Sequence, residues 1–310
     1  MPKVVVLGVF VADTAHRAAR MPVMGETVLG EAFSLGPGGK GSNQAVAAAL
    51  AASTGGVEAH FISKLGKDPF ADMALETWRS AGVHPAVTHH EDSYTGAAFI
   101  FLEAATGNNA IIVSPGAAQT ISPADMEQHH DLIGQATVFM TQLEQPLDAA
   151  LRALEIAKAG EATTVLNPAP AAKVPDTMLA LCDFVTPNES EAEALIGEKV
   201  KTVDDARHAA RLLCQRGAGA AIITLGEQGA LYFDGAASHH VPALNAGPVV
   251  ETTGAGDAFN GGFAVAIAEG CPPLEAVRFG CATAGLSVTR AGAANAMPTR
   301  DDIDKLISAR

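Results

Sequence analysis

Short apolar strands alternate with helices along most of this chain, and that alternation is the strongest constraint on its fold. Val4–Phe10 is a continuous β-branched run, typical of a strand that is covered on both faces. An alanine-rich helix is expected over Ser42–Ala52. Further strands are expected at Ala59–Ser63, Thr137–Met140, Thr163–Leu166, Phe184–Thr186 and Ala220–Thr224. Further helices are expected at Phe70–Ala81, Pro146–Ala159, Asp176–Leu181, Glu189–Gly197, Thr202–Arg216, Ala255–Glu269, Leu274–Arg290 and Asp301–Ala309. Repeated strand–helix units predict an α/β fold with a mostly parallel, doubly wound sheet.

Two stretches interrupt this alternation. Residues 11–35 carry Gly, Pro and short alternating pieces, and residues 95–113 read as two strands joined by a Gly-Asn turn. We expect both to form a small β lid over the edge of the main sheet; the alternative is an ordinary edge hairpin. No linker separates independent domains, so residues 1–310 are predicted to form one domain.

Composition excludes several classes of protein. The chain has 310 residues, of which 48% are hydrophobic and 17% charged, which excludes disorder and a coiled coil. The net charge of −14 disfavours nucleic-acid binding. No apolar run approaches the roughly 18 residues of a membrane span. The four cysteines form no CxxC pair, so we expect reduced thiols in a soluble, cytoplasmic protein.

A first glycine cluster, residues 36–41, leads directly into the alanine-rich helix. Consecutive glycines let a backbone approach a ligand closely, and a helix N-terminus favours polar or anionic groups. The cluster is not a P-loop, because Lys40 is followed by Gly41 rather than Ser or Thr. Lys40 and Asn43 are therefore predicted to face a substrate, with a helix-capping turn as the alternative.

A second cluster, Thr252–Gly262, also precedes a helix. The amides of Ala255, Gly256 and Asp257 are expected to be unpaired and to hold negative charge on a transferring phosphoryl group. The Asp257 carboxylate in the same turn is suited to accept a hydroxyl proton. An Asp that only caps the helix is the alternative.

Two further segments end strands and begin helices or loops. Asn188 and Glu191 are one helical turn apart. This spacing suits a site that binds a Mg²⁺-coordinated water or a phosphate, but it also suits a capping box. The strand Ala220–Thr224 ends in a Gly-rich loop, Leu225–Gly229. Ligands of open α/β sheets bind at strand carboxyl ends, so this loop is expected to contact a nucleotide.

Together, these motifs resemble the ribokinase (PfkB) family of carbohydrate kinases over nearly the whole chain. The resemblance includes Gly25-Glu26-Thr27, GGKGSNQA at 38–45, Gln142-Leu143-Glu144, Asn167-Pro168-Ala169-Pro170, TPNESEAE at 186–193, ITLGEQG at 223–229, GAGDAFNGG at 254–262 and VTRAGA at 288–293. It implies a Rossmann-type three-layer α/β/α core with a small β-sheet lid, and a homodimer formed through that lid. It also implies ATP-dependent phosphorylation of a sugar, foremost D-ribose at its 5-hydroxyl, with Mg²⁺ and K⁺ as cofactors.

The resemblance assigns roles to individual residues. Asp257 matches the catalytic base that contacts the reacting hydroxyl, and the anion hole matches Gly254, Ala255 and Gly256. Sugar contacts match Asp13, Gly39, Lys40, Asn43 and Glu144. Nucleotide contacts match Asn188, Thr224, Leu225, Gly226, Glu227, Gln228, Gly229, Gly256 and Cys281. Asn188 with Glu191 matches the magnesium and phosphate motif, and the K⁺ ligands match Glu251, Thr253, Ser287, Arg290, Gly292 and Ala296.

Two positions depart from the family pattern. Ribose kinases carry Asn two residues before the sugar-binding Asp, where this chain has Val11. A hydroxyl facing Val11 would lose a partner, at about 1–3 kcal/mol, which raises 2-deoxyribose or another sugar as a rival substrate. A nucleoside kinase and a non-catalytic sugar-binding homologue are further alternatives. At the cation site, Glu251 stands where the family carries Asp, and its longer side chain would shift the ligating oxygen.

Overall fold

The computed structural model describes residues 1–52 and 56–309. Within them, a nine-stranded sheet has the order β13-β12-β11-β10-β9-β8-β1-β4-β5. The strands from β11 to β5 are parallel, whereas β12 and β13 add antiparallel at one edge. These strands are β1 (Lys3–Leu7), β4 (Glu58–Leu65), β5 (His84–His89), β8 (Val138–Thr141), β9 (Thr163–Leu166), β10 (Phe184–Val185), β11 (Ala220–Thr224), β12 (Ala230–Phe233) and β13 (Ser238–Val241).

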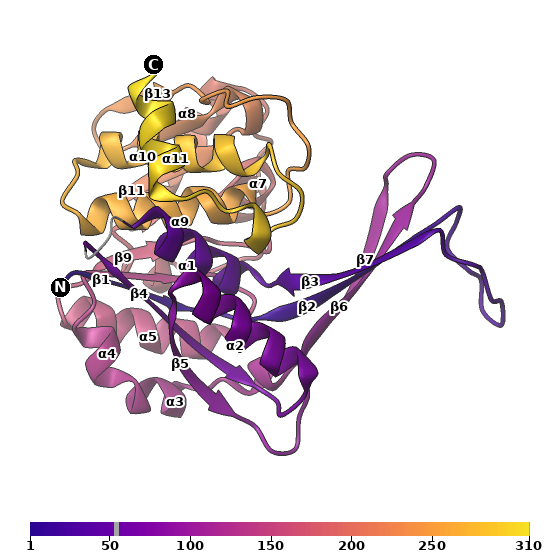
Figure 1. Cartoon of the computed structure of the whole chain (residues 1–310). Coiled ribbons are helices and arrows are strands. Elements are labelled where there is room, and N and C mark those ends of the chain that lie inside the picture. The colour runs from indigo at the N-terminus through magenta and orange to yellow at the C-terminus, as the bar shows by residue number, and fades with distance from the viewer. Residues whose placement is uncertain (53–55, 310) are drawn as a thin grey trace.

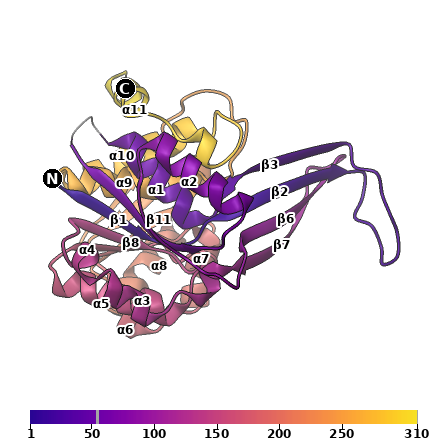
Figure 2. The same ribbon diagram turned by 60° about the horizontal axis from the view of Figure 1, so that its bottom comes forward.

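Helices cover both faces of this sheet (Figure 2). One layer contains α1 (Lys40–Ala51), α2 (Pro69–Ala81), α9 (Ala255–Ala268), α10 (Pro273–Ser287) and α11 (Arg300–Ser308); the other contains α3 (Pro123–Gln128), α4 (His130–Gly134), α5 (Leu147–Ala159), α6 (Asp176–Leu179), α7 (Glu189–Ile196) and α8 (Val203–Gln215). Successive strand residues point to opposite faces, so Val4 and Val6 join one hydrophobic cluster and Val5 joins the other. The predicted three-layer α/β/α core is confirmed.

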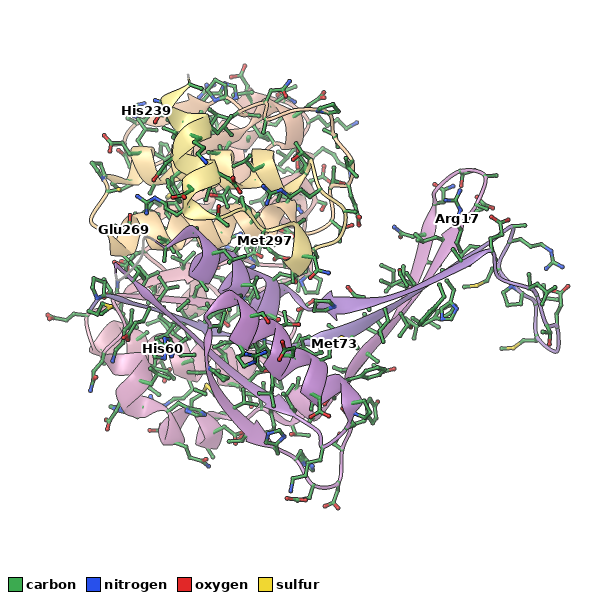
Figure 3. The ribbon with its side chains drawn as sticks, viewed as in Figure 1. Arg17, His60, Met73, His239, Glu269 and Met297 are labelled. Atoms are coloured by element: carbon green, nitrogen blue, oxygen red, sulfur yellow. The ribbon has the colours of Figure 1, made fainter. Side chains whose placement is uncertain are left out.

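A second sheet projects from this body as an arm (Figure 1). Its order is β3 (Ala32–Gly38), β2 (Val11–Ala18), β6 (Thr95–Glu103) and β7 (Asn109–Gly116). These strands come from the two stretches that interrupt the strand–helix alternation. Arg17, labelled in Figure 3, lies on the projecting part. Several large apolar side chains of the arm are exposed, namely Phe33, Leu35, Ile111, Ile112 and Val113.

The structure differs from the prediction at several elements. β1 ends at Leu7 rather than Phe10, and β5, β12, β13, α3 and α4 are additional. β1 ends before Gly8, where the backbone lies against Gly41 at the start of α1. Among residues 1–52 and 56–309, none of the helices has the length and apolar composition of a membrane span.

Candidate active site

Two glycines bring the N-terminus of α1 against the end of β1. A Cβ built on Gly8 would lie 2.7 Å from the Cα of Gly41, and one on Gly41 would lie 2.6 Å from the Cα of Gly8. Gly39 has φ +89°, and a Cβ there would lie 2.5 Å from the carbonyl oxygen of Val9. Since backbone atoms cannot move aside, only glycine fits at these positions. The first glycine cluster therefore fixes the start of α1, with Lys40 and Asn43 in its first turn.

Asp257, in the first turn of α9, is buried beside α1. Its Oδ2 accepts a hydrogen bond from Nδ2 of Asn43 at 3.0 Å, and its Oδ1 accepts one from Nε2 of Gln44, also at 3.0 Å. Burial raises the pKa of Asp257, although the positive charge of Lys40 and the two donated hydrogen bonds oppose this effect. A buried carboxylate with a raised pKa is suited to accept a proton during catalysis.

Three charged groups, Lys40, Glu144 and Glu191, lie close enough to this carboxylate for their charges to interact with it. The backbone N–H of Lys40 donates to Oε2 of Glu144 at 2.8 Å. Burial raises the pKa of Glu144 to about 7, partly offset by the charge of Lys40, and burial raises the pKa of Asp13 to about 6. Burial alone would lower the pKa of Lys40, but Asp257, Glu144 and Glu191 together raise it. The structure thus places two of the predicted sugar contacts, Glu144 and Asp257, beside the charge of Lys40. The charge of Asp13 interacts in turn with Glu144.

The turn before α9 shows one error in the sequence prediction. The N–H of Ala255 was expected to be unpaired, but it donates to the carbonyl of Thr252 at 3.2 Å. The reason is a tight turn in which Gly254 has φ +77° and ψ 2°, as at the third position of a type II turn. The amides of Gly256 and Asp257 follow at the start of the helix, where N–H groups have no intrahelical partner. Of the three amides predicted to hold negative charge, those of Gly256 and Asp257 thus remain available, and that of Ala255 does not.

Asn188 and Glu191 form a reciprocal cap at the start of α7. Oδ1 of Asn188 accepts from the N–H of Glu191 at 2.9 Å, and Oε2 of Glu191 accepts from the N–H of Asn188 at 2.9 Å. Burial raises the pKa of Glu191, while the Asn188 amide and Lys40 oppose it. The capping-box alternative is therefore present in the structure, and it holds the Glu191 carboxylate close enough to Lys40 and Asp257 for their charges to interact.

The predicted nucleotide loop lies next to this cap. A β-bridge joins Asn188 to Thr224, and the N–H of Thr224 donates to the carbonyl of Pro187 at 3.0 Å. Residues Gly226–Gln228 then form a single 3₁₀ turn, which is closed when the N–H of Leu225 donates to the carbonyl of Gly229 at 2.8 Å. Cys281 is buried in α10, and burial raises the pKa of its thiol to about 12, so it is a neutral group.

The residues predicted to hold K⁺ come from three segments that the structure joins. Oε2 of Glu251 accepts from the N–H of Gly292 at 2.8 Å. The N–H of Glu251 donates to the carbonyl of Val288 at 3.2 Å, and the Ser287 carbonyl accepts from the N–H of Arg290 at 3.1 Å. Thr253 lies before α9, and Ala296 lies in the 3₁₀ turn Ala294–Ala296. One carboxylate oxygen and one carbonyl of the predicted set thus already have partners within the protein.

Some polar residues of the site were not predicted. Gln44, Gln142, Asn167 and Asn260 are buried and hydrogen-bonded to one another or to residues around Asp257. Each stands within a motif of the chain, but their partners are as distant as 213 positions along the sequence. The only sequence signal for these residues was the presence of an amide side chain within each motif.

Known protein sequences match this chain over nearly its whole length. A family model described as pfkB family carbohydrate kinase matches residues 1–300. A ribokinase of Haemophilus influenzae is 36% identical over 298 residues, covering 96% of this chain and 95% of that protein. A deoxyribokinase of Salmonella typhi is 35% identical, covering 98% of each chain.

Solved structures give the same result for the fold. The structure of an Arabidopsis thaliana ribokinase complexed with ribose and ATP has a TM-score of 0.90 and 30% identity, covering 99% of this chain and 98% of the other. A ribokinase of Thermotoga maritima has a TM-score of 0.89 and 32% identity, covering 99% and 100%. The chain has the ribokinase-like α/β fold and belongs to the pfkB family of carbohydrate kinases, which transfer phosphate to the hydroxyl group of a sugar.

Proposed function

We propose that this protein transfers the γ-phosphoryl group of ATP to the 5-hydroxyl of D-ribose. The observation that carries this proposal is the buried Asp257 carboxylate, which lies at the start of α9 beside Lys40 and the α1 N-terminus. Ribokinases among the relatives, and the plant ribokinase complexed with ribose and ATP, support the choice of sugar and nucleotide.

In the proposed mechanism, Asp13, Lys40, Asn43 and Glu144, together with the backbone of Gly39, orient the sugar. Asp257 accepts the proton as the O5–H bond breaks and O5 bonds to the γ-phosphorus. The bond from that phosphorus to the β-phosphate oxygen breaks at the same time, and ADP leaves. The amides of Gly256 and Asp257 stabilise the charge that develops on the phosphoryl oxygens.

Magnesium fits the donors near Asn188. Each carboxylate oxygen of Glu191 accepts one hydrogen bond from Asn188 and keeps a lone pair for a metal or its bound water, whereas Oδ1 of Asn188 already accepts two hydrogen bonds. Mg²⁺ typically takes one or two carboxylates together with substrate phosphates. No group of three His, Cys, Asp or Glu residues suited to a metal occurs in the described part of the chain, so most ligands would be phosphate and water oxygens. Bound there, Mg²⁺ would offset phosphate charge beside Glu191 and Asp257. The nucleotide itself would contact the Thr224–Gly229 loop and Cys281.

We further propose that K⁺ activates the enzyme at the loops around Glu251. The Glu251–Gly292 hydrogen bond holds together the segments whose backbone oxygens would bind the ion. Backbone carbonyl oxygens can replace the hydration shell of K⁺.

The projecting sheet is proposed to close over the sugar as a lid and to pair with a second copy, within a single domain spanning residues 1–310. Its exposed apolar side chains support this pairing: Phe33 is 61% exposed and Ile112 is 62% exposed. Light scattering tests this pairing: Ile112→Lys should yield a monomer, while Lys64→Ala, on β4 outside the projecting sheet, should not. A molecular mass of Ile112→Lys that equals that of the wild-type protein would contradict pairing through this sheet.

The free thiols of all four cysteines support a cytoplasmic location.

A second candidate substrate is 2-deoxy-D-ribose. Val11 is 4% exposed and packs within the core at the start of β2, two residues before Asp13. An apolar group there favours a sugar that lacks the matching hydroxyl, and deoxyribokinases occur among the relatives.

ADP release with Mg-ATP tests the proposal, with D-ribose, 2-deoxy-D-ribose and adenosine compared with and without K⁺. D-ribose should give the highest kcat/KM, and K⁺ should raise kcat. A higher kcat/KM for either rival would replace the substrate while leaving the kinase chemistry, and no ADP release above the buffer rate with any of them would favour a non-catalytic homologue.

A further inference from the structure

Buried side-chain amides surround Asp257 on the side of the protein core. Gln44 lies at their centre, in the first turns of α1, and is 0% exposed. Its Nε2 donates to Oδ1 of Asp257 and to Oδ1 of Asn167, both at 3.0 Å. Its Oε1 accepts from Nε2 of Gln142 at 2.6 Å. Both hydrogens of the amide are therefore used, and its orientation is fixed from two sides.

These bonds continue into a closed circuit. Nδ2 of Asn167, after β9, donates to the carbonyl of Thr186 at 2.9 Å. The Thr186 hydroxyl donates to Oδ1 of Asn260 at 2.6 Å, and Nδ2 of Asn260 donates to the carbonyl of Gly256 at 2.8 Å. Gly256 directly precedes Asp257, so the circuit returns to the turn that carries the carboxylate. It links the ends of β9 and β10 to α1 and α9, which pack side by side (Figure 1).

We propose that Gln44 is a positioning residue, which sets the rotation and the proton affinity of the Asp257 carboxylate. This proposal rests on the role of Asp257 as the base. Asn43 binds one carboxylate oxygen and Gln44 the other, so the carboxylate cannot rotate without breaking a buried hydrogen bond. Each oxygen keeps acceptor capacity for the sugar hydroxyl. The N–H of Gln44 also stabilises the anionic form.

A merely structural glutamine would contribute only to stability. Its loss would lower the free energy of unfolding but would leave the pH dependence of turnover unchanged. A positioning residue moves the acidic limb of kcat, because that limb reports the pKa of the base in the enzyme–substrate complex and is separate from the effect of Asp13 and Glu144 on the KM for D-ribose. The charged groups that interact with Asp257 are Lys40, Glu144 and Glu191, and the Gln44 variants leave all three in place. Loss of the N–H donor raises that pKa, by about one to two pH units for a hydrogen bond to a charged group.

Gln44→Met tests the proposal, because methionine keeps the length of the side chain without an N–H. Ser42→Ala is the matched control: Ser42 is buried in the same helix and accepts a hydrogen bond from Nε1 of Trp78 at 2.8 Å, but it does not contact Asp257. We expect Gln44→Met to lower kcat about 10- to 100-fold, to change the KM values for D-ribose and ATP by less than about threefold, and to move the acidic limb upward by about one pH unit or more. Ser42→Ala should retain the wild-type limb.

Gln44→Glu is the second variant in case the methionine variant does not fold. It keeps the size of the side chain but adds a negative charge beside Asp257, so the acidic limb should rise further. A wild-type limb and kcat in a folded Gln44 variant would overturn the positioning role. Asp257→Asn is measured in parallel to test the role of Asp257 as the base. If that variant keeps more than about a tenth of wild-type kcat, the base assignment fails. If Asp257→Asn is inactive but the Gln44 variants behave as wild type, only the role of Gln44 is contradicted.

Discussion

Replacing Gly38 by alanine should displace the carboxylate of Asp13 while leaving the fold in place. Gly38 ends β3, which pairs with β2. A Cβ at position 38 would lie 2.2 Å from Oδ2 and 2.5 Å from Cγ of Asp13, whereas ordinary van der Waals contact begins at 3.4 Å. The carboxylate oxygen therefore has to move by roughly 1 Å.

The cost of this movement falls on sugar binding rather than on stability. The group that must yield is the end of a side chain rather than backbone, so the free energy of unfolding should fall by no more than about 1–2 kcal/mol. A misplacement of roughly 1 Å at a positioning group costs up to about 100-fold. We therefore expect the KM for D-ribose to rise about 10- to 100-fold, with the KM for ATP unchanged.

Steady-state ADP release measures both constants, and Gly36→Ala is the control. Gly36 lies on the same strand, but a Cβ there would have no neighbour within 4 Å, so this variant should retain the wild-type KM. In an Asp13→Ala background, Gly38→Ala should add no further loss, since its target has been removed. A wild-type KM for D-ribose in the single Gly38→Ala variant would refute the sugar-contact role of Asp13.

Three further predictions concern the same site. The KM for D-ribose should rise as the pH falls through about 7 and then about 6, because Glu144 and Asp13 then gain protons and lose acceptor capacity; a KM that stays constant over this range would contradict their role. Val11→Asn should shift the kcat/KM preference toward D-ribose over 2-deoxy-D-ribose by about 10-fold or more, and an unchanged preference would exclude Val11 as the determinant. Glu251→Ala should abolish activation by K⁺ and lower the melting temperature by only a few degrees, as measured by titration of KCl and by thermal unfolding; intact activation would place the cation elsewhere.

The sequence predicted the elements whose signals are local. β9 was predicted with its observed bounds, because three of the four residues in Thr163–Leu166 are β-branched and the segment follows a predicted helix. β5 was missed because His84–His89 contains a proline and three polar residues without a period-two pattern, and therefore reads as a loop. β12 was missed because it directly follows the Gly-rich loop that ends at Gly229, and β13 was missed because Ser238–Val241 is mostly polar. Such strands are defined by pairing with a neighbour, which no local pattern contains.

The site residues that were predicted also have local signals in the sequence, and those that were missed do not. Lys40, Asn43 and Asp257 were predicted because glycines and helix starts accompany them in the sequence. Gln44 was not, because its partners are Asp257 and Asn167, 213 and 123 positions away. The turn that pairs the N–H of Ala255 depends on the φ of Gly254, which the sequence alone does not specify.

The most direct test of the account is phosphorus NMR of the product formed from Mg-ATP and D-ribose, with the wild-type enzyme and with Asp257→Asn. The 5-hydroxyl is carried by a CH₂ group, so phosphate transferred to it should give a triplet from two coupled protons. We predict this triplet with the wild-type enzyme and no comparable product with Asp257→Asn. A doublet, which indicates transfer to a secondary hydroxyl, or a triplet that forms as quickly with Asp257→Asn, would contradict the assignment of the acceptor or of the base.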